Sequence, residues 1–276
     1  MWQHERDLEY IKGFRMIDDD FMKMVFDNKA AIKELLKIIL ENDDFEIVTY
    51  KVEYVVPNFK GRGIRIDIYA KNSKGEHFAI EIQRSDQGAG FIRARFIGSM
   101  LDAELSKPGD NYNDLPPIYV IFITENDIIG DGRSIYHIEN TVVETGRIVD
   151  DKMHIIYVNG QSREDSEIGK LMHDFFQSDP DKIHNPVLAE RVRYLKNTEE
   201  GVGSMCRAME EMRAEVAAEA AKEAAAKATA ETAAKAAAAA KEAAKEAAEN
   251  LKAAGVSEEI IKTTIACILN KTVSSV

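Results

Sequence analysis

Apolar and polar residues follow two different periods in the first two hundred residues of the chain. Between 19 and 42, apolar side chains recur at helical spacing, which predicts two consecutive helices with Asp19 or Asp20 as the capping residue. Residues 45–56 are rich in β-branched side chains, and residues 64–69 alternate strictly between apolar and polar, which predicts two strands.

The middle of the chain continues in the order strand, helix, strand. After a turn at 72–75, residues 77–83 alternate again and form a hairpin with the preceding strand. Helical spacing returns over 91–105, and the continuously apolar run 118–124 is typical of a strand covered on both faces. With a later strand at 154–158 and a helix near 168–176, the pattern predicts an α/β or α+β domain.

The end of the chain has a different composition. Residues 214–254 are mostly Ala, punctuated by Glu and Lys at the favourable i, i+4 spacing, so we expect one long helix. Heptads of Leu and Ile are absent, so no strong coiled coil is encoded, although Ala faces permit weak helix association. A solvated spacer is the preferred interpretation. Gly255 ends this helix, and Ser257 begins a short amphipathic one whose apolar face favours self-association or docking.

These changes divide the chain into three parts. We expect a globular domain over 1–204, the long Ala-rich helix over 205–254 and the short amphipathic helix over 255–276.

Charge and cysteine content narrow the function. The 36 Lys and Arg residues against 48 Asp and Glu give a net charge of -12, which argues against a protein that coats nucleic acid nonspecifically. The two cysteines, Cys206 and Cys267, fit neither a disulfide framework nor a zinc ribbon. The acidic N-terminus does not look like a signal peptide, and no apolar run is long enough to span a membrane. We therefore expect a cytoplasmic protein without a membrane partner.

Carboxylates on the predicted hairpin are the main candidates for chemistry. Asp67 lies on the first strand, and Glu81 and Gln83 share one face of the second because side chains alternate with period two. Mg²⁺ prefers oxygen ligands, so Asp67 and Glu81 suit a metal beside a phosphate, with Gln83 orienting a water. By itself the pattern is weak, because acidic residues on amphipathic strands usually face solvent.

The surrounding segments strengthen this interpretation. The segments that carry the likeness are DDDFMKMVF (18–26), GRGIRIDIYA (61–70), AIEIQRSDQGAGFIRARF (79–96), SKPGDNY (106–112), PIYVIFITENDIIGDGRSIYHIE (117–139), HIIYVNG (154–160), IGKLMHDFFQSDPD (168–181) and LAERVRYLKNTEEGVGSMCRAMEEMR (188–213). They resemble the PD-(D/E)XK nuclease superfamily, and most closely its recombination-promoting nuclease, or transposase-like, branch. In that branch Gln commonly takes the Lys position.

The resemblance implies both a fold and an activity. The fold is a restriction-endonuclease-like core, in which helices flank a mixed central sheet. The activity is hydrolysis of phosphodiester bonds in DNA by a metal-activated water, without a small-molecule cofactor. Mg²⁺ or Mn²⁺ would be held by Asp67 and Glu81, with Gln83 in the water-orienting position. Glu34, on the helix before the first strand, is the candidate for an additional catalytic acid, although an exposed helical Glu is also ordinary.

Basic residues surround the hairpin and predict contact with DNA. Arg93 and Arg95, at the start of the following helix, are placed to clamp phosphates, although the competing interpretation is that at least one of them simply pairs with a surface carboxylate. Together the group predicts a local phosphate-attracting cleft within an acidic protein. Its members are Lys60, Arg62, Arg65, Arg84, Arg93 and Arg95.

Gln83 leaves a second hypothesis open. A Gln amide carries no positive charge and cannot shuttle a proton, so slow or conditional turnover is expected. The alternative is a weak or inactive nuclease fold that acts as an interaction module and forms homo-oligomers through its C-terminal helices. An RNA nuclease on the same scaffold also stays open, because such a site does not itself read the 2′-hydroxyl.

Other candidates are weaker. The histidines show no metal-ligand spacing, the acidic segment 124–132 reads as a turn, and three aromatic residues near the hairpin are more typical of packing than of base stacking. The histidines are His137, His154, His173 and His184, and the aromatic residues are Tyr50, Tyr54 and Phe59.

Overall fold

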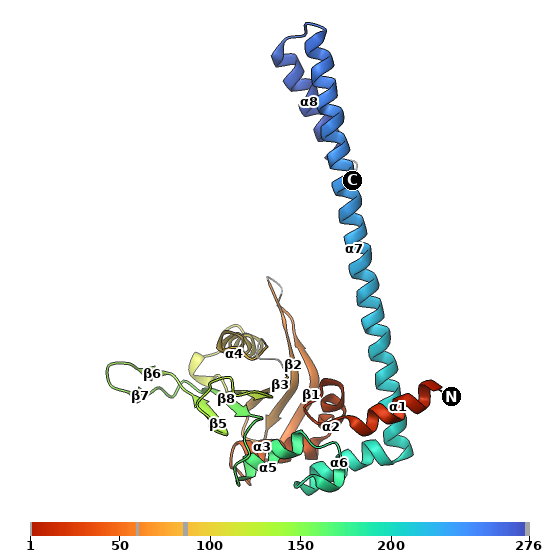
Figure 1. The fold of residues 1–276 in the computed structure, drawn as a ribbon. Helices are drawn as coiled ribbons and strands as arrows, with labels where there is room; N and C mark the ends of the chain where they lie inside the picture. Colours follow the sequence, from red (N-terminus) through yellow and green to blue (C-terminus); the bar gives the residue numbers. More distant parts are fainter. Residues whose placement is uncertain (1, 59–60, 85–87, 274–276) are drawn as a thin grey trace. The chain divides into compact units, whose positions relative to one another are not determined.

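A computed structural model describes residues 2–58, 61–84 and 88–273 (Figure 1). The chain divides into two compact units, Met1–Met209 and Glu210–Val276, and each is described by itself. The α-helices are α1 (Trp2–Gly13), α2 (Asp19–Phe26), α3 (Lys29–Ile39), α4 (Phe91–Leu105), α5 (Glu167–Phe175), α6 (Pro186–Asn197), α7 (Glu199–Ala253) and α8 (Glu258–Val273), with short 3₁₀ helices at Tyr112–Asp114 and Pro180–Lys182. The strands are β1 (Ile47–Val56), β2 (Ile64–Asn72), β3 (His77–Gln83), β4 (Ile118–Thr124), β5 (Ile135–Ile138), β6 (Thr141–Val142), β7 (Arg147–Ile148) and β8 (Met153–Asn159).

A six-stranded mixed sheet forms the centre of the first unit. Its order is β1-β2-β3-β4-β8-β5, with antiparallel pairing from β1 to β3, parallel pairing from β3 through β4 to β8, and antiparallel pairing of β5 on β8. The strands β6 and β7 pair separately. The predicted mixed sheet flanked by helices is therefore confirmed.

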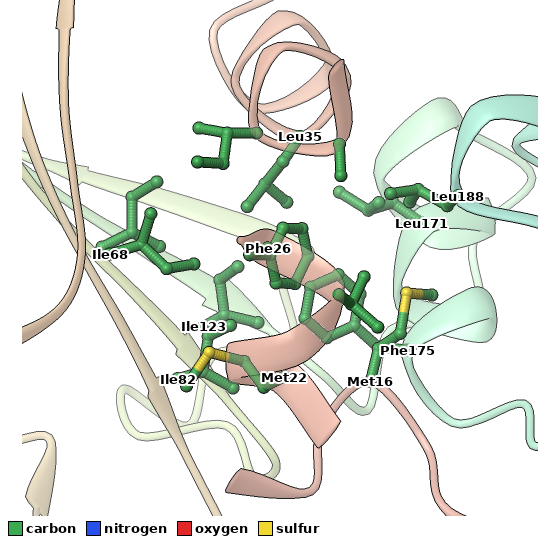
Figure 2. Close-up of a cluster of buried hydrophobic side chains, with 14 of the residues drawn as sticks. Met16, Met22, Phe26, Leu35, Ile68, Ile82, Ile123, Leu171, Phe175 and Leu188 are labelled. Carbon is green, nitrogen blue, oxygen red and sulfur yellow. The ribbon is translucent and has the colours of Figure 1, made fainter. Parts of the chain in front are cut away.

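The larger hydrophobic core covers one face of this sheet. Helices α2, α3, α5 and α6 pack there, and Figure 2 shows Phe26, Leu35 and Leu171 from three of them meeting the sheet residues Ile68 and Ile123. Each of these five side chains is essentially inaccessible to solvent. Because a residue of this size stabilises the fold by about 1.5–3 kcal/mol when it is buried, this face is the main source of stability.

Helix α4 covers the opposite face of the sheet. Its residues Ala94, Ile97 and Leu101 are buried against Val120 and Phe122 of β4 in a second cluster. Alternation along β3 decides which side chain meets which core: Ile80 and Ile82 join the larger cluster, so Glu81 and Gln83 point to the α4 side. The candidate residues of β3 therefore lie beneath α4.

Most predicted elements of the first unit are confirmed. The helix at 91–105 and the strand at 118–124 have the expected ends, and the turn before β3 contains Gly75 at φ +84°, a conformation that favours glycine. One detail is wrong: the residue that precedes α2 is Asp18, not Asp19 or Asp20, and its carboxylate binds Arg15 rather than capping the helix.

The second unit consists of the rest of α7 and of α8. Helix α7 ends at Ala253, and Gly255 at φ +76° allows the chain to turn, as the sequence predicts. Figure 1 shows α8 running back along the end of α7, and Ala244 is buried within this unit. Ile261 and Ile265 are half-buried whereas Ile260 is exposed, so α7 takes up part of the apolar surface of α8.

Within the described residues, no helix combines the length and the apolar content that crossing a bilayer requires. Cys206 is not in a disulfide, and the side chain of Cys267 lies outside what the structure describes.

Candidate active site

The strands β2 and β3 separate at Asp67. Their ladder ends at the pair Ile68 and Ile80, one position before Asp67 and Glu81 would face each other. The Asp67 carboxylate instead accepts a hydrogen bond from the Ile82 amide at 2.9 Å, an amide that the shortened ladder leaves available. The splayed strand ends therefore bring both carboxylates to the same place, as the sequence predicts.

Glu81 is the most deeply buried ionisable group of the site. Its side chain is 0% exposed, and its Oε2 atom binds the guanidinium of Arg93 from α4. The amide of Gln83 lies 3.5 Å from the same oxygen. The other oxygen, Oε1, has no hydrogen-bond partner among the described residues. A buried carboxylate oxygen without a partner is costly, so this atom marks a place for a positively charged ligand.

Burial and nearby negative charge raise the pKa values of both acids. Desolvation, followed by the charge of Asp67, raises the pKa of Glu81 to about 8, and Arg93 opposes this shift. Desolvation also raises the pKa of Asp67, which the Ile82 amide lowers and the charge of Asp19 raises further. Two carboxyl groups whose pKa values rise together form a site in which the cationic charge present does not balance both acids.

The donor set fits a divalent cation. Carboxylate oxygens are the ligands that Mg²⁺ and Mn²⁺ prefer, and an ion bound between Asp67 and Glu81 would satisfy the unpartnered Oε1 atom of Glu81.

An open cleft of about 880 Å³ lies in front of these acids. Asp67 and Gln83 line it directly, whereas Glu81 lies behind them, covered by Arg93. Four of the predicted basic residues also line the cleft, namely Arg62, Arg65, Arg84 and Arg93. Lys60 lies outside the described residues. Arg95 is exposed on α4 and does not line the cleft.

Acidic neighbours compensate most of this positive charge. Arg65 lies 3.5 Å from Glu53, and Arg84 lies 3.1 Å from Asp18 and 3.2 Å from Glu125. Arg93 binds Glu81 and the Gly88 carbonyl. Arg62 makes no ion pair within the described part of the chain. Three of the four arginines that line the cleft are therefore paired with carboxylates, and the partner of Arg93 is the buried Glu81 rather than a surface acid.

The structure does not bring Glu34 to the cleft. Its carboxylate lies 3.6 Å from Lys37 and 3.4 Å from the Asn185 amide, in a separate cavity bounded by α3 and α5. The acid that reaches the cleft from a helix is Asp19, in the first turn of α2. The triplet of Asp residues at 18–20 was the available signal, but acidic residues are also common in the first turn of a helix.

Gly88 is a site residue that the sequence pattern missed. A Cβ atom at this position would lie 2.1 Å from Gln83 Oε1 and 3.4 Å from an Arg93 nitrogen, and its carbonyl accepts a hydrogen bond from Arg93 at 3.0 Å. Glycine at this position allows the loop to press against both side chains and hold them over Glu81.

Two of the weaker candidates, His173 and His184, lie together although their spacing in the sequence does not predict it, and with Asp174 they offer ligand atoms within 4.8 Å of one another. His173 and His184 meet around Asp174, whose buried carboxylate accepts the backbone amides of His184 and Asn185 at the start of α6. Three backbone amides donate to Asp127, consistent with a turn.

The aromatic candidates near the hairpin mostly pack. Tyr54 packs on Tyr69 with ring centroids 4.6 Å apart, and Tyr50 packs against the larger core. Phe59 lies outside the described residues.

Comparison with known proteins agrees with this geometry. A family model described as PD-(D/E)XK nuclease family transposase matches residues 19–255. Neither the curated proteins nor the solved structures give a match. The matched range includes every residue of the cleft except Ile17, among them Asp19, Asp67, Gln83 and Arg93.

Proposed function

Because the chain belongs to the PD-(D/E)XK nuclease transposase family, we propose that it is a divalent-metal-dependent endonuclease that hydrolyses phosphodiester bonds in DNA. The observation that carries the proposal is that Asp67, which lines an open cleft, lies close enough to the buried Glu81 for its charge to act on it, and that one Glu81 oxygen has no partner among the described residues. A fold that only needed a stable hairpin gains nothing from two buried acids, since each costs desolvation free energy.

In this proposal Asp67 and Glu81 hold the ion, and the Ile82 amide fixes the Asp67 carboxylate. The chemistry supplied by Mg²⁺ or Mn²⁺ is polarisation of the phosphate and acidification of a water molecule. The Gln83 amide lies beside Glu81 and can orient that water by hydrogen bonding. The Gln83 amide is neutral, so the positive charge that a Lys at this position would bring must come from another residue.

Arg93 is the group that supplies this charge. Its guanidinium already contacts Glu81, and the Gly88 carbonyl holds a second nitrogen at 3.0 Å. Guanidinium stays protonated and binds phosphate oxygens in the same forked geometry that it uses for carboxylates. We assign to Arg93 the stabilisation of charge on the phosphate during cleavage.

Asp19 takes the role that the sequence suggested for Glu34. It lies at the cleft, and its negative charge acts on Asp67. An acid at this position can bind a water of the metal shell or accept a proton from it.

Nicking of supercoiled plasmid DNA tests the proposal. With Mg²⁺ or Mn²⁺ present, we expect Asp67→Ala and Glu81→Ala to lower the rate by roughly a hundredfold or more, the usual size of the loss when a group that stabilises transition-state charge is removed. Asp19→Asn should also slow cutting. The matched control is Glu34→Gln, which lies in a different cavity and should cut like the parent.

Two results would overturn the proposal. One is equal nicking by the parent and by both alanine variants, which would indicate a contaminating nuclease. The other is a folded parent that fails to cut DNA with any of the divalent metals tested. The second result would favour the interaction module, which the neutral Gln83 and the compensated arginines also suit.

A further inference from the structure

Exposed apolar side chains lie on the first turns of α4, beside the acids of the cleft. Phe91 is 52% exposed, Ile92 is 74% exposed and Phe96 is 37% exposed. We call these three residues the α4 apolar patch. Ile92 and Phe96 line the same cleft as Asp67 and Gln83, whereas Phe91 packs edge-on against Tyr157 beside it.

Packing of α4 on the sheet does not account for the patch. The helix buries Ala94, Ile97 and Leu101 against the sheet, so the side facing β4 is already filled. Ile92 and Phe96 are four residues apart and therefore share another side of the helix. Several large apolar residues exposed together on a soluble protein usually mark a binding surface.

Charge and shape indicate what binds there. The cleft that Ile92 and Phe96 line also contains Arg62, which makes no ion pair in the described part of the chain, and Arg93. A surface that combines arginines with apolar and aromatic side chains suits single-stranded nucleic acid, whose phosphates meet the charges while its bases stack on the apolar groups. In an intact duplex the bases are stacked on one another, so a patch at this place would face only the charged backbone.

We propose that the α4 apolar patch is a subsite for unpaired nucleobases, so that the substrate is single-stranded or carries unpaired bases next to the bond that is cut. This inference rests on the proposed function for the cleavage step. The binding part can be measured without cleavage.

Fluorescence anisotropy with a labelled single-stranded oligonucleotide and with the matching blunt duplex tests the proposal. The full chain with Asp67→Asn is used in Mg²⁺, so that bound DNA stays intact. We expect tighter binding of the single strand, and we expect Ile92→Ser together with Phe96→Ser to weaken that binding roughly tenfold, the size of one lost stacking interaction. Binding of the duplex should change little.

Val143→Ser is the matched control, because Val143 is 89% exposed in the same unit but does not line the cleft. Ile92→Ser alone serves as a second variant, since a residue that is 74% exposed can be replaced without disturbing the core. Equal binding of both DNA forms, binding of neither, or single-strand binding that survives both substitutions would overturn the subsite. If the patch instead pairs two copies of the chain, the serine substitutions would lower the molecular mass in solution and leave DNA binding unchanged.

The outcome separates the two proposals. Single-strand binding that depends on the patch, in a chain that never cuts, would leave the subsite standing and refute the nuclease. The opposite result is cutting that depends on Asp67, is equally fast on intact duplex and is unaffected by either serine substitution. It would support the nuclease and refute the subsite.

Discussion

His77, at the start of β3, shows how one buried residue sets a response to pH. Its ring is 4% exposed, its Nδ1 atom lies 2.6 Å from the Tyr69 hydroxyl, and burial lowers its pKa from 6.5 to about 4. Between these two values the unfolded chain binds a proton that the folded chain does not, so acid favours unfolding. The contribution of His77 is complete above pH 6.5 and is lost as the pH falls towards 4.

We therefore predict that the free energy of unfolding falls by up to about 2 kcal/mol more between pH 7 and pH 5 in the parent than in His77→Gln, which has no titrating ring. Urea denaturation at the two pH values measures the difference. The comparison with the variant is needed because carboxyl groups with raised pKa values, such as Glu81, act in the opposite direction. The same pH response in both proteins would contradict the prediction.

At the residue scale, alternation was enough to predict that Glu81 and Gln83 lie side by side. Period two puts Glu81 and Gln83 on one face, and that inference needs no tertiary information. The choice between Glu34 and Asp19 depends on which face of the sheet each helix reaches, and helical spacing does not contain that information. Pairing of the arginines was equally hidden, because Arg84 meets Glu125 only after β3 and β4 lie side by side.

At the element scale, Lys196 of α6 ties three chain segments together. Its ammonium donates to the carbonyls of Lys12 at 3.0 Å, Phe14 at 2.5 Å and Ser178 at 2.6 Å, and the residue is 6% exposed. These three bonds use all of its protons and satisfy carbonyls at the end of α1 and after α5.

Lys196→Met should lower the free energy of unfolding by about 2–4 kcal/mol, because buried carbonyls would lose their donors while the apolar stem is kept. Urea denaturation measures this loss. Lys182→Met is the control: its side chain is 69% exposed, so we expect a change within about 0.5 kcal/mol. A similar, small effect of both substitutions would mean that water replaces the ammonium at these carbonyls.

Most elements with a strong pattern were predicted, although α6 was missed, and α1 and β5, whose patterns are weak, were missed as well. The run 118–124 is apolar throughout and was placed correctly, because a central strand is buried on both faces. Helix α1 buries little beyond Asp7 and Ile11 among its described side chains, so its sequence has no apolar stripe to detect. Strand β5 has only four residues and lies at the sheet edge, where neighbouring strands rather than its own sequence decide its structure.

At the scale of the whole molecule, composition alone placed the start of the long helix too late. We expected it at 205, but α7 begins at Glu199, because its first residues belong to the core of the first unit rather than to the Ala-rich run. Met205 and Met209 are 0% and 5% exposed, and both lie in the larger cluster. The change to an Ala-rich composition marks where the burial of apolar side chains stops, and in this chain that point lies inside α7.

Two truncated chains test this division. A chain that ends after Arg213 keeps both methionines, so its first unit should unfold within about 1 kcal/mol of the parent and cut DNA at the parent's rate. A chain that ends after Thr198 loses both, and since burying a Met side chain is worth about 1.5–3 kcal/mol, it should lose about 3–6 kcal/mol. Urea denaturation of the two chains measures the contrast.

If the longer chain were also strongly destabilised, the Ala-rich helix would contribute to the stability of the first unit. If it kept its stability but lost a homo-oligomeric mass that the parent shows in light scattering, the second unit would be an assembly element, as the alternative function requires.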